Sequence, residues 1–234
     1  MKSLKIFVTS LLLATGLCAS AQSKTTSPNE WQTGYFQWNP SSFEPDQGDN
    51  QSFTGLSLGW SKAIQVAASS PWHIEAGAAL QYSFYSEDGG GIEEKFNMFS
   101  VKVPIHVLYM FKLNNSNIEI LPYAGLNVRY NISGTVKYTW DDDYDDDDYD
   151  YWAKTRAYDD DYDDGGSYKA NLFDKKDMGG SKYTWKRLQL GWEIGVKARF
   201  NGKYLVGLSY GSDFGEIAKD TKVHTTSITL GYCF

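Results

Sequence analysis

The sequence predicts an all-β protein, and more narrowly an eight-stranded antiparallel up-and-down transmembrane β-barrel with short periplasmic turns and long extracellular loops. Three observations lead to this fold class. An export signal opens the chain, long segments alternate between large apolar and small or polar residues, and the connections between these segments are alternately short and long. Alternation with a period of two is typical of a strand whose two faces meet different surroundings.

The export signal is predicted in the first 21 residues. Two early lysines precede an apolar run that ends on small residues, so we expect cleavage after Ala21. The run is shorter than the ~20 residues that a membrane-spanning helix needs. Lipidation at Cys18 is the alternative, and it is disfavoured because Leu17 stands where a small residue is expected. The predicted organisation is therefore a cleaved signal peptide (1–21) and one outer-membrane barrel domain (22–234).

The acidity of the chain comes from one segment. Without the signal peptide, 20 basic residues face 29 acidic ones, a net charge of −9. Residues 141–164 alone contribute −11, so the remainder carries +2. This balance argues against nucleic acid as a partner. Cys233 is then the single remaining cysteine, which excludes an internal disulfide from the predicted domain.

The clearest strand is "RLQLGWEIGVKARF", residues 187–200, in which every second residue is apolar and the residues between are charged, polar or glycine. Fourteen residues span roughly 46 Å, which suits a tilted strand that crosses an apolar band of ~25 Å and continues beyond it. In the longest strand, we expect Val136 on the outer face and Lys137 on the inner face. The eight predicted strands are 31–38, 54–64, 73–85, 99–111, 118–138, 187–200, 204–211 and 224–234.

The connections separate into two classes along the chain. Short and long connections alternate, as the two ends of an outer-membrane barrel require, whereas a soluble sandwich has no reason to sort its loops in this way. With both termini in the periplasm, the long connections are extracellular, and the longest (139–184) is an Asp-rich loop insertion. The long ones are 39–52, 86–95, 139–184 and 212–222, and the short ones are 65–71, 112–117 and 201–203.

The last strand ends on an aromatic residue, with Leu230, Tyr232 and Phe234 at alternate positions. This ending resembles the C-terminal signal that the barrel assembly machinery recognises, which makes that machinery and outer-membrane lipid the expected partners. The segments "VKVPIHVLYMF", "ILPYAGLNVRYNISG" and "LGWEIGVKARF" resemble the PorT-like outer-membrane β-barrel family over most of residues 31–234, the Asp-rich loop excepted. The resemblance implies an integral barrel in the bacterial outer membrane and implies no particular activity.

Charged residues on the predicted inner faces bear on whether the barrel conducts. An eight-stranded barrel is just wide enough for side chains to fill it, and buried charges need partners. We therefore expect a charge network that plugs the lumen and a structural or surface-interaction role, while a small porin-like channel is the alternative. The expected network consists of Glu75, Lys102, Glu119, Arg129, Arg187, Glu193, Lys197 and Arg199.

No catalytic signature accompanies these patterns. The three histidines are His73, His106 and His224, and hydroxyl residues adjoin His224. Some small outer-membrane barrels modify lipids with a Ser-His-acid set on one rim. No activated-nucleophile motif surrounds His224, however, so the sequence does not predict an enzyme or a cofactor.

The Asp-rich stretch predicts weak cation binding. Its spacing does not match an EF-hand loop, because Tyr162 falls on a ligand position and Asn171 falls where Glu belongs. A block of like charges is typical of a solvated segment, so we expect loosely bound Ca²⁺ or Mg²⁺, or an adhesive surface formed with the interleaved tyrosines. The carboxylates concerned are Asp141, Asp142, Asp143, Asp145, Asp146, Asp147, Asp148, Asp150, Asp159, Asp160, Asp161, Asp163 and Asp164.

Overall fold

The computed structural model describes residues 30–45, 50–89, 91–114, 116–140, 166–180 and 183–234. Ten antiparallel strands form a single sheet. They are β1 (Glu30–Pro45), β2 (Gln51–Gln65), β3 (Trp72–Gly89), β4 (Ile92–Tyr109), β5 (Phe111–Lys112), β6 (Ile118–Trp140), β7 (Ser167–Asn171), β8 (Leu188–Phe200), β9 (Tyr204–Asp213) and β10 (Thr221–Cys233).

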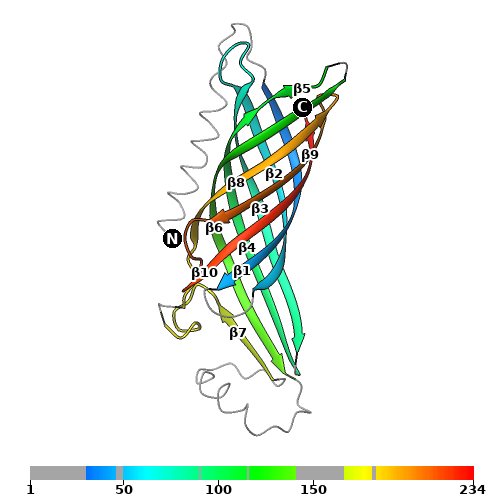
Figure 1. Ribbon diagram of the computed structural model, residues 1–234. Helices are drawn as coiled ribbons and strands as arrows, with labels where there is room; N and C mark the ends of the chain where they lie inside the picture. Colours follow the sequence, from blue (N-terminus) through cyan, green and yellow to red (C-terminus); the bar gives the residue numbers. More distant parts are fainter. Residues whose placement is uncertain (1–29, 46–49, 90, 115, 141–165, 181–182) are drawn as a thin grey trace.

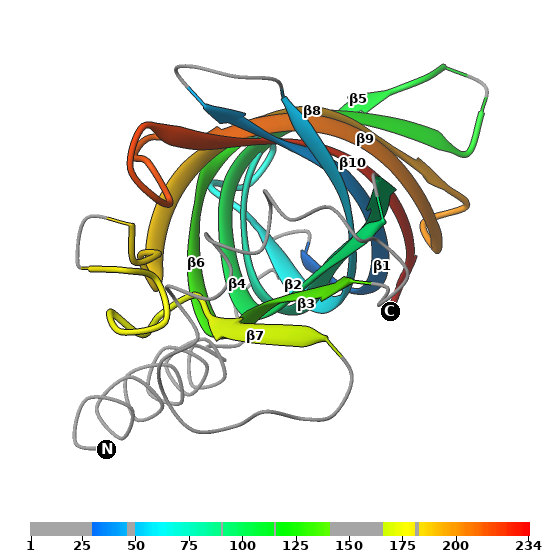
Figure 2. The same ribbon diagram turned by 90° about the horizontal axis from the view of Figure 1, so that it is seen from below.

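The sheet closes on itself into a barrel (Figures 1 and 2). Sequential strands pair around the ring, and the pairings of β1 with β10 and of β4 with β6 complete it. Eight strands form the wall, while β5 and β7 each pair only with β6 at opposite ends. The C-terminus lies at the end that carries β5, and β7 lies at the other end (Figure 1). The predicted all-β up-and-down barrel is therefore confirmed.

Along most of its length, the wall has an apolar outer face and a polar inner face. Leu58 is 70 % exposed and Leu80 is 51 % exposed, whereas their neighbours Ser57 and Gln81 are buried. The alternation read from the sequence thus assigns the two faces correctly over this part of the barrel, which we call the apolar section.

The polarity of the two faces is exchanged toward the β7 end. We call this part the extension, and here the residues that point inward are aromatic or aliphatic and those that point outward are polar. The inward residues form one cluster, which also contains Met98, Leu172 and Ile217. The extension comprises residues 41–45, 51–54, 85–98, 133–140, 166–172 and 221–225. The inward residues that close its interior are Phe43, Phe53, Phe96, Val136, Ala170 and Val223.

A β-bulge in β6 explains one error in the predicted faces. The pairing of β4 with β6 shifts between Phe99 and Ser100, which leaves Ile132 without a direct partner. An extra residue in a strand reverses the face of every side chain that follows it. Val136 is consequently buried and Lys137 exposed, so the prediction that placed Val136 outside and Lys137 inside is wrong.

The predicted boundaries also need correction at the β7 end. β1 continues to Pro45 and β2 begins at Gln51, so most of the predicted loop 39–52 is strand. The predicted loop 86–95 is the tip of the hairpin formed by β3 and β4, and β7 lies within the predicted loop 139–184. Continued pairing beyond the apolar section satisfies backbone groups that a loop would leave to water.

Two predictions lie outside the described residues, namely the signal peptide (1–21) and the Asp-rich stretch (141–164). The described residues contain no helix that is long and apolar enough to cross a membrane.

Candidate functional site

Four buried or largely buried ion pairs line the lumen of the apolar section. Each joins strands that are distant in sequence, and together they contain four acids and four bases. A buried charge is costly without a partner, so the equal numbers of acids and bases matter more than how many pairs there are. The pairs are Lys197–Glu75 (2.6 Å), Lys102–Glu193 (2.8 Å), Arg199–Glu119 (2.5 Å) and Arg129–Asp213.

Glu193 lies at the centre of this network. Its Oε2 accepts from Lys102 Nζ, and its Oε1 accepts from Tyr123 Oη and from Ser209 Oγ, both at 2.9 Å. β8 supplies the carboxylate, while β4, β6 and β9 supply the donors. Three donors from three different strands tie the interior of the barrel together across its width.

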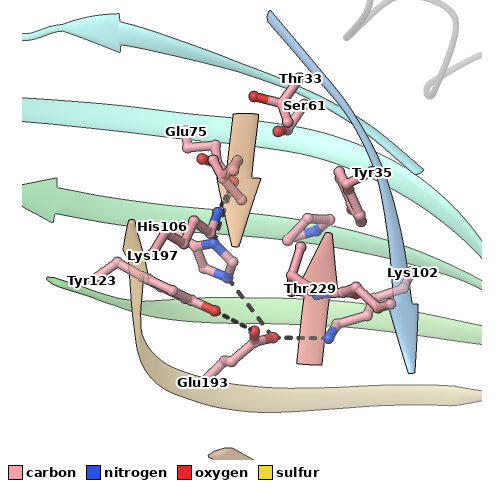
Figure 3. A pocket seen from close by; sticks show the side chains of 13 residues that line it. Thr33, Tyr35, Ser61, Glu75, Lys102, His106, Tyr123, Glu193, Lys197 and Thr229 are labelled. Atoms are coloured by element: carbon pink, nitrogen blue, oxygen red, sulfur yellow. Dashed lines mark hydrogen bonds and ion pairs between the residues drawn. The ribbon is translucent and has the colours of Figure 1, made fainter. Parts of the chain in front are cut away.

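His106 stands between two carboxylates of the network, with Nδ1 3.7 Å from Glu75 and Nε2 3.9 Å from Glu193. Both ring nitrogens are buried without a hydrogen-bond partner in the described residues. Figure 3 shows these side chains converging with those of Lys102, Tyr123 and Lys197 around a cavity of about 20 Å³. Such a volume suffices for a water molecule, and water there could hydrogen-bond to the imidazole.

Apolar side chains border the network toward both ends of the lumen, and at the end opposite β7 the Arg199–Glu119 pair lies among them. At the β7 end lies the interior of the extension, where Phe43 stacks on Phe53 at 4.3 Å between ring centroids. At the opposite end, Leu108 and Leu121 are fully buried beside Trp31. A second cavity of about 20 Å³ lies beside Arg129 and Asp213, within the polar layer.

Arg187 does not belong to the network, contrary to the prediction. It is exposed, its guanidinium donates to the backbone carbonyls of Asn131 and Ile132 at 3.2 and 2.7 Å, and it stacks on the Phe173 ring at 4.2 Å. The carbonyls beside the bulge are the groups that bind it. The other seven predicted members line the lumen, and all of them form the ion pairs described above.

Asp213 is the member that the sequence analysis missed, because it was assigned to a loop. Small inward residues continue along β9 through Ser209 and Gly211 to Asp213, and this period of two could have revealed it. The predicted network had an excess of two positive charges. Without Arg187 and with Asp213, the observed network has equal numbers of acids and bases.

The remaining predicted site residues fall in different places. Leu230, Tyr232 and Phe234 are exposed on the outer face, and the Phe234 backbone exchanges hydrogen bonds with Gln32 of β1. Among the described residues, no group of three or more His, Cys, Asp or Glu side chains could hold a metal ion. The predicted cation-binding aspartates lie outside the described residues.

A second polar constellation lies on the outer face of the extension. His224 Nε2 is 2.5 Å from Glu44 Oε2, and its Nδ1 is 3.0 Å from Tyr210 Oη. Ser42 lies directly opposite His224 in the register of β1 and β10. A serine nucleophile needs a free imidazole nitrogen as its base, and here Glu44 and Tyr210 engage both nitrogens. The geometry therefore does not form a serine triad.

The comparisons with known proteins agree with the barrel architecture. A family model described as "Outer membrane protein beta-barrel domain" matches residues 9–234. No curated protein sequence matches the chain. Among solved structures, the attachment invasion locus protein Ail of Yersinia pestis is 13% identical, with 88% of this chain and 100% of that chain covered and a TM-score of 0.46.

Two further solved structures resemble the chain to a similar degree. Neisserial surface protein A is 12% identical over 87% of this chain and 97% of that chain, with a TM-score of 0.44. The outer membrane enzyme PagL is 14% identical over 83% of this chain and 97% of that chain, with a TM-score of 0.37. Likeness of this degree says nothing about activity.

Proposed function

Because the chain belongs to the outer-membrane protein β-barrel domain family, and is thus an integral protein of the bacterial outer membrane, we propose that it acts as a closed, non-enzymatic barrel with a structural or surface-interaction role. The observation that carries this proposal is the order in which apolar side chains and ion pairs fill the lumen along the barrel. An aromatic cluster occupies the β7 end, three ion pairs occupy the middle, and at the opposite end the Arg199–Glu119 pair lies against Trp31 among buried apolar side chains.

Each layer opposes ion flow for a different physical reason. The aromatic cluster at the β7 end offers no groups to replace the hydration shell of an ion. In the polar layer, each charge already has a partner, and the two cavities are only large enough for water. A small porin-like channel is the second candidate, and the polar lining of the middle layer is the observation that favours it.

Single-channel recording in a planar bilayer separates these two functions. We expect the refolded protein to insert without stepwise conductance. A variant that truncates the apolar layer of the extension (Phe43→Ala, Phe53→Ala and Phe96→Ala together) tests which layer seals the lumen. We expect it to remain silent, because the ion pairs persist. Stable stepwise currents from the unmodified protein would favour the channel instead.

The absence of an enzymatic role is part of the proposal. Its support is that Glu44 and Tyr210 engage both His224 nitrogens, which leaves neither nitrogen to activate a serine. The purified protein is expected to leave outer-membrane lipids unmodified when lipid extracts are compared by mass spectrometry before and after incubation.

Three finer assignments are likewise proposals. Membership of the PorT-like branch is supported by the segments that resemble it. Recognition by the barrel assembly machinery is supported by the alternate exposed residues Leu230, Tyr232 and Phe234 on the last strand. Loose binding of Ca²⁺ or Mg²⁺ by residues 141–164 is supported by their density of Asp, and calorimetry of a variant that lacks them tests it.

A further inference from the structure

A groove of about 600 Å³ lies on the outer face of the extension, across β9, β10, β1, β2 and β3. Small side chains, which we call its floor, line it together with the larger rings of Phe84 and Tyr210. Its volume is typical of a site for a small molecule. The small residues of the floor are Pro40, Ser42, Ser52, Thr54 and Thr226.

The position of the groove identifies the kind of molecule that reaches it. Two residues farther along the same strands, the outer face carries Trp38, Leu56 and Ile228, which lie opposite one another in register and are exposed. These residues belong to the face that contacts hydrocarbon in an outer-membrane barrel. The groove therefore begins where the apolar face ends on the extracellular side, at the headgroups of the outer leaflet, and its neighbours there are lipids.

The chemistry of the groove favours a headgroup rich in hydroxyls. The hydroxyl residues Ser42, Ser52 and Thr226 line it together with His224, which pairs with Glu44. Hydroxyls donate to and accept from sugar hydroxyls, and carboxylates accept from them, while the rings of Phe84 and Tyr210 provide apolar faces. No lysine or arginine lines the groove itself, so a phosphate would not be bound within it.

A row of lysines adjoins the groove on the side of β3. Ser86, which lines the groove, lies opposite Lys95, Lys95 lies opposite Lys137, and Lys137 lies opposite Lys169. All three lysines are exposed. Neighbouring strands are about 4.8 Å apart, and like charges directly opposite each other destabilise a sheet. A row of this kind is stabilised by an anion that bridges its members.

Little of the charge in this row is neutralised by the described residues. Lys95 contacts Glu93 at 2.7 Å, and the hydrogen bond from Lys95 holds the pKa of Glu93 below its ordinary value, so that carboxylate stays charged. Lys137 and Lys169 have no ion pair with any residue that the structure describes. The row therefore retains two positive charges beside a hydroxyl-lined groove.

We propose that the groove and the lysine row together bind one phosphorylated glycolipid of the outer leaflet. The sugar lies in the groove over Ser42, Ser52 and Thr226, the phosphate lies against the lysine row, whose members without an ion pair in the described residues are Lys137 and Lys169, and the acyl chains follow the apolar face below. The site specifies a ligand for the surface-interaction role proposed above and rests on that role. It does not depend on whether the lumen conducts.

The unmodified protein provides the first test. The full chain in detergent is titrated with purified outer-membrane glycolipid, either phosphorylated or treated with phosphatase, and bound lipid is counted by native mass spectrometry. The phosphorylated form should bind at least tenfold more tightly. Equal affinity for both forms would overturn the role of the lysine row. Inorganic phosphate alone should not compete at millimolar concentration, and effective competition would show a free-phosphate site instead.

Charge-matched variants provide the second test. Each lysine near an anionic lipid surface contributes roughly fivefold to affinity, so Lys95→Gln, Lys137→Gln and Lys169→Gln together should weaken binding by about a hundredfold. The control replaces Lys175, Lys176 and Lys186 by Gln, which removes the same charge from exposed positions outside the row and away from the groove. Equal losses in the two triple variants would reduce the effect to net charge and contradict the proposal.

The groove is tested by filling it. Ser52→Trp places a large ring on its floor, and Ser133→Trp places the same ring on an exposed outer position of β6. We expect the first to reduce binding of both lipid forms by at least tenfold and the second to leave it unchanged. Unchanged binding in Ser52→Trp would exclude the groove. Heat-modifiable migration in gels shows whether each variant has folded. Whether the phosphate is recognised is decided with the unmodified protein alone.

The Asp-rich stretch is the competing occupant of the lysine row. It leaves the described chain at Trp140 and returns at Gly166, and the Trp140 amide donates to the Gly166 carbonyl at 3.0 Å. If this stretch neutralised the row, the lysine variant would bind the phosphorylated lipid as the unmodified full chain does, and only deletion of 141–164 would reveal a lysine effect. That result would overturn the proposal. If the row binds the lipid, the lysine effect is present in both backgrounds.

Discussion

The apolar section and the extension are built from the same strands, yet they place opposite kinds of residue on their two faces. On β4, the inward residues change from Lys102 and His106 in the apolar section to Met98 and Phe96 in the extension. The outward residues change in the opposite sense, from Ile105 to Lys95. The surroundings of the wall decide this exchange, because hydrocarbon covers one part and water the other.

The comparison also shows how the two parts obtain stability from different interactions. In the apolar section, the outward side chains contact lipid rather than one another, so their packing adds little to the stability of the protein. The interior of this section is stabilised by paired charges and hydrogen bonds. In the extension, the interior is an aromatic cluster. The ring centroid of Phe96 lies 5.2 Å from that of Tyr85 and 5.5 Å from that of Trp185. The extension thus resembles the core of a soluble barrel placed on a membrane barrel.

The largest effect is expected from the charge network. Glu193→Ala leaves Lys102 buried without a partner, which typically costs ~3–5 kcal/mol, so the free energy of unfolding in lipid vesicles should fall by that amount. The control is Glu30→Gln at the rim, where Glu30 is 3.1 Å from Lys62 and its side chain is 45% exposed. Exposed pairs contribute about 0–1 kcal/mol. Similar effects of both substitutions would mean that water screens the lumen.

A smaller effect is expected from charges placed on the outer face. Leu80 and Asp88 both point outward on β3, one in the apolar section and one at the tip of the hairpin. Leu80→Lys should destabilise the protein by about 2–4 kcal/mol, because it places an ammonium in hydrocarbon. Asp88→Lys should change the stability by no more than about 0.5 kcal/mol. Denaturant titration in vesicles measures both, and equal costs would mean that the hairpin tip also lies within the membrane.

The difference between the apolar section and the extension also explains how much of this architecture the sequence could predict. In the apolar section, each strand separates two very different surroundings, so a period of two identifies the outward residues, as for Leu188 and Leu190. Seven of the eight charged residues in the lumen were predictable, because they alternate with apolar outward residues, although their partners depend on the tertiary register. The inclusion of Arg187 and the omission of Asp213 both arose at strand ends, where alternation alone does not locate the boundary.

In the extension, the strand boundaries are harder to predict from the sequence, for a physical reason. Outward polar residues such as Ser52 and Lys95 look like loop residues when the outer face is expected to be apolar, so strands were ended too early. The bulge at Ile132 left no local signature, because Asn131, Ile132 and Ser133 continue an ordinary alternation until the pairing with β4 is known. β7 was not expected, since its five residues pair only with β6.

The smallest effect is expected at the two residues whose faces the bulge exchanges. Val136 is 7% exposed inside the aromatic cluster, whereas Lys137 is exposed on the outer face. Removing buried methyl groups costs about 0.5–1.5 kcal/mol each, so Val136→Ala should destabilise the extension by about 1–3 kcal/mol. Lys137→Ala should have an effect within about 0.5 kcal/mol. Hydrogen exchange of the β6 and β7 amides measures this local stability, because the extension can open while the membrane barrel stays closed. If Lys137→Ala were the more destabilising of the two, the bulge would be absent in solution and the faces would follow the uninterrupted alternation.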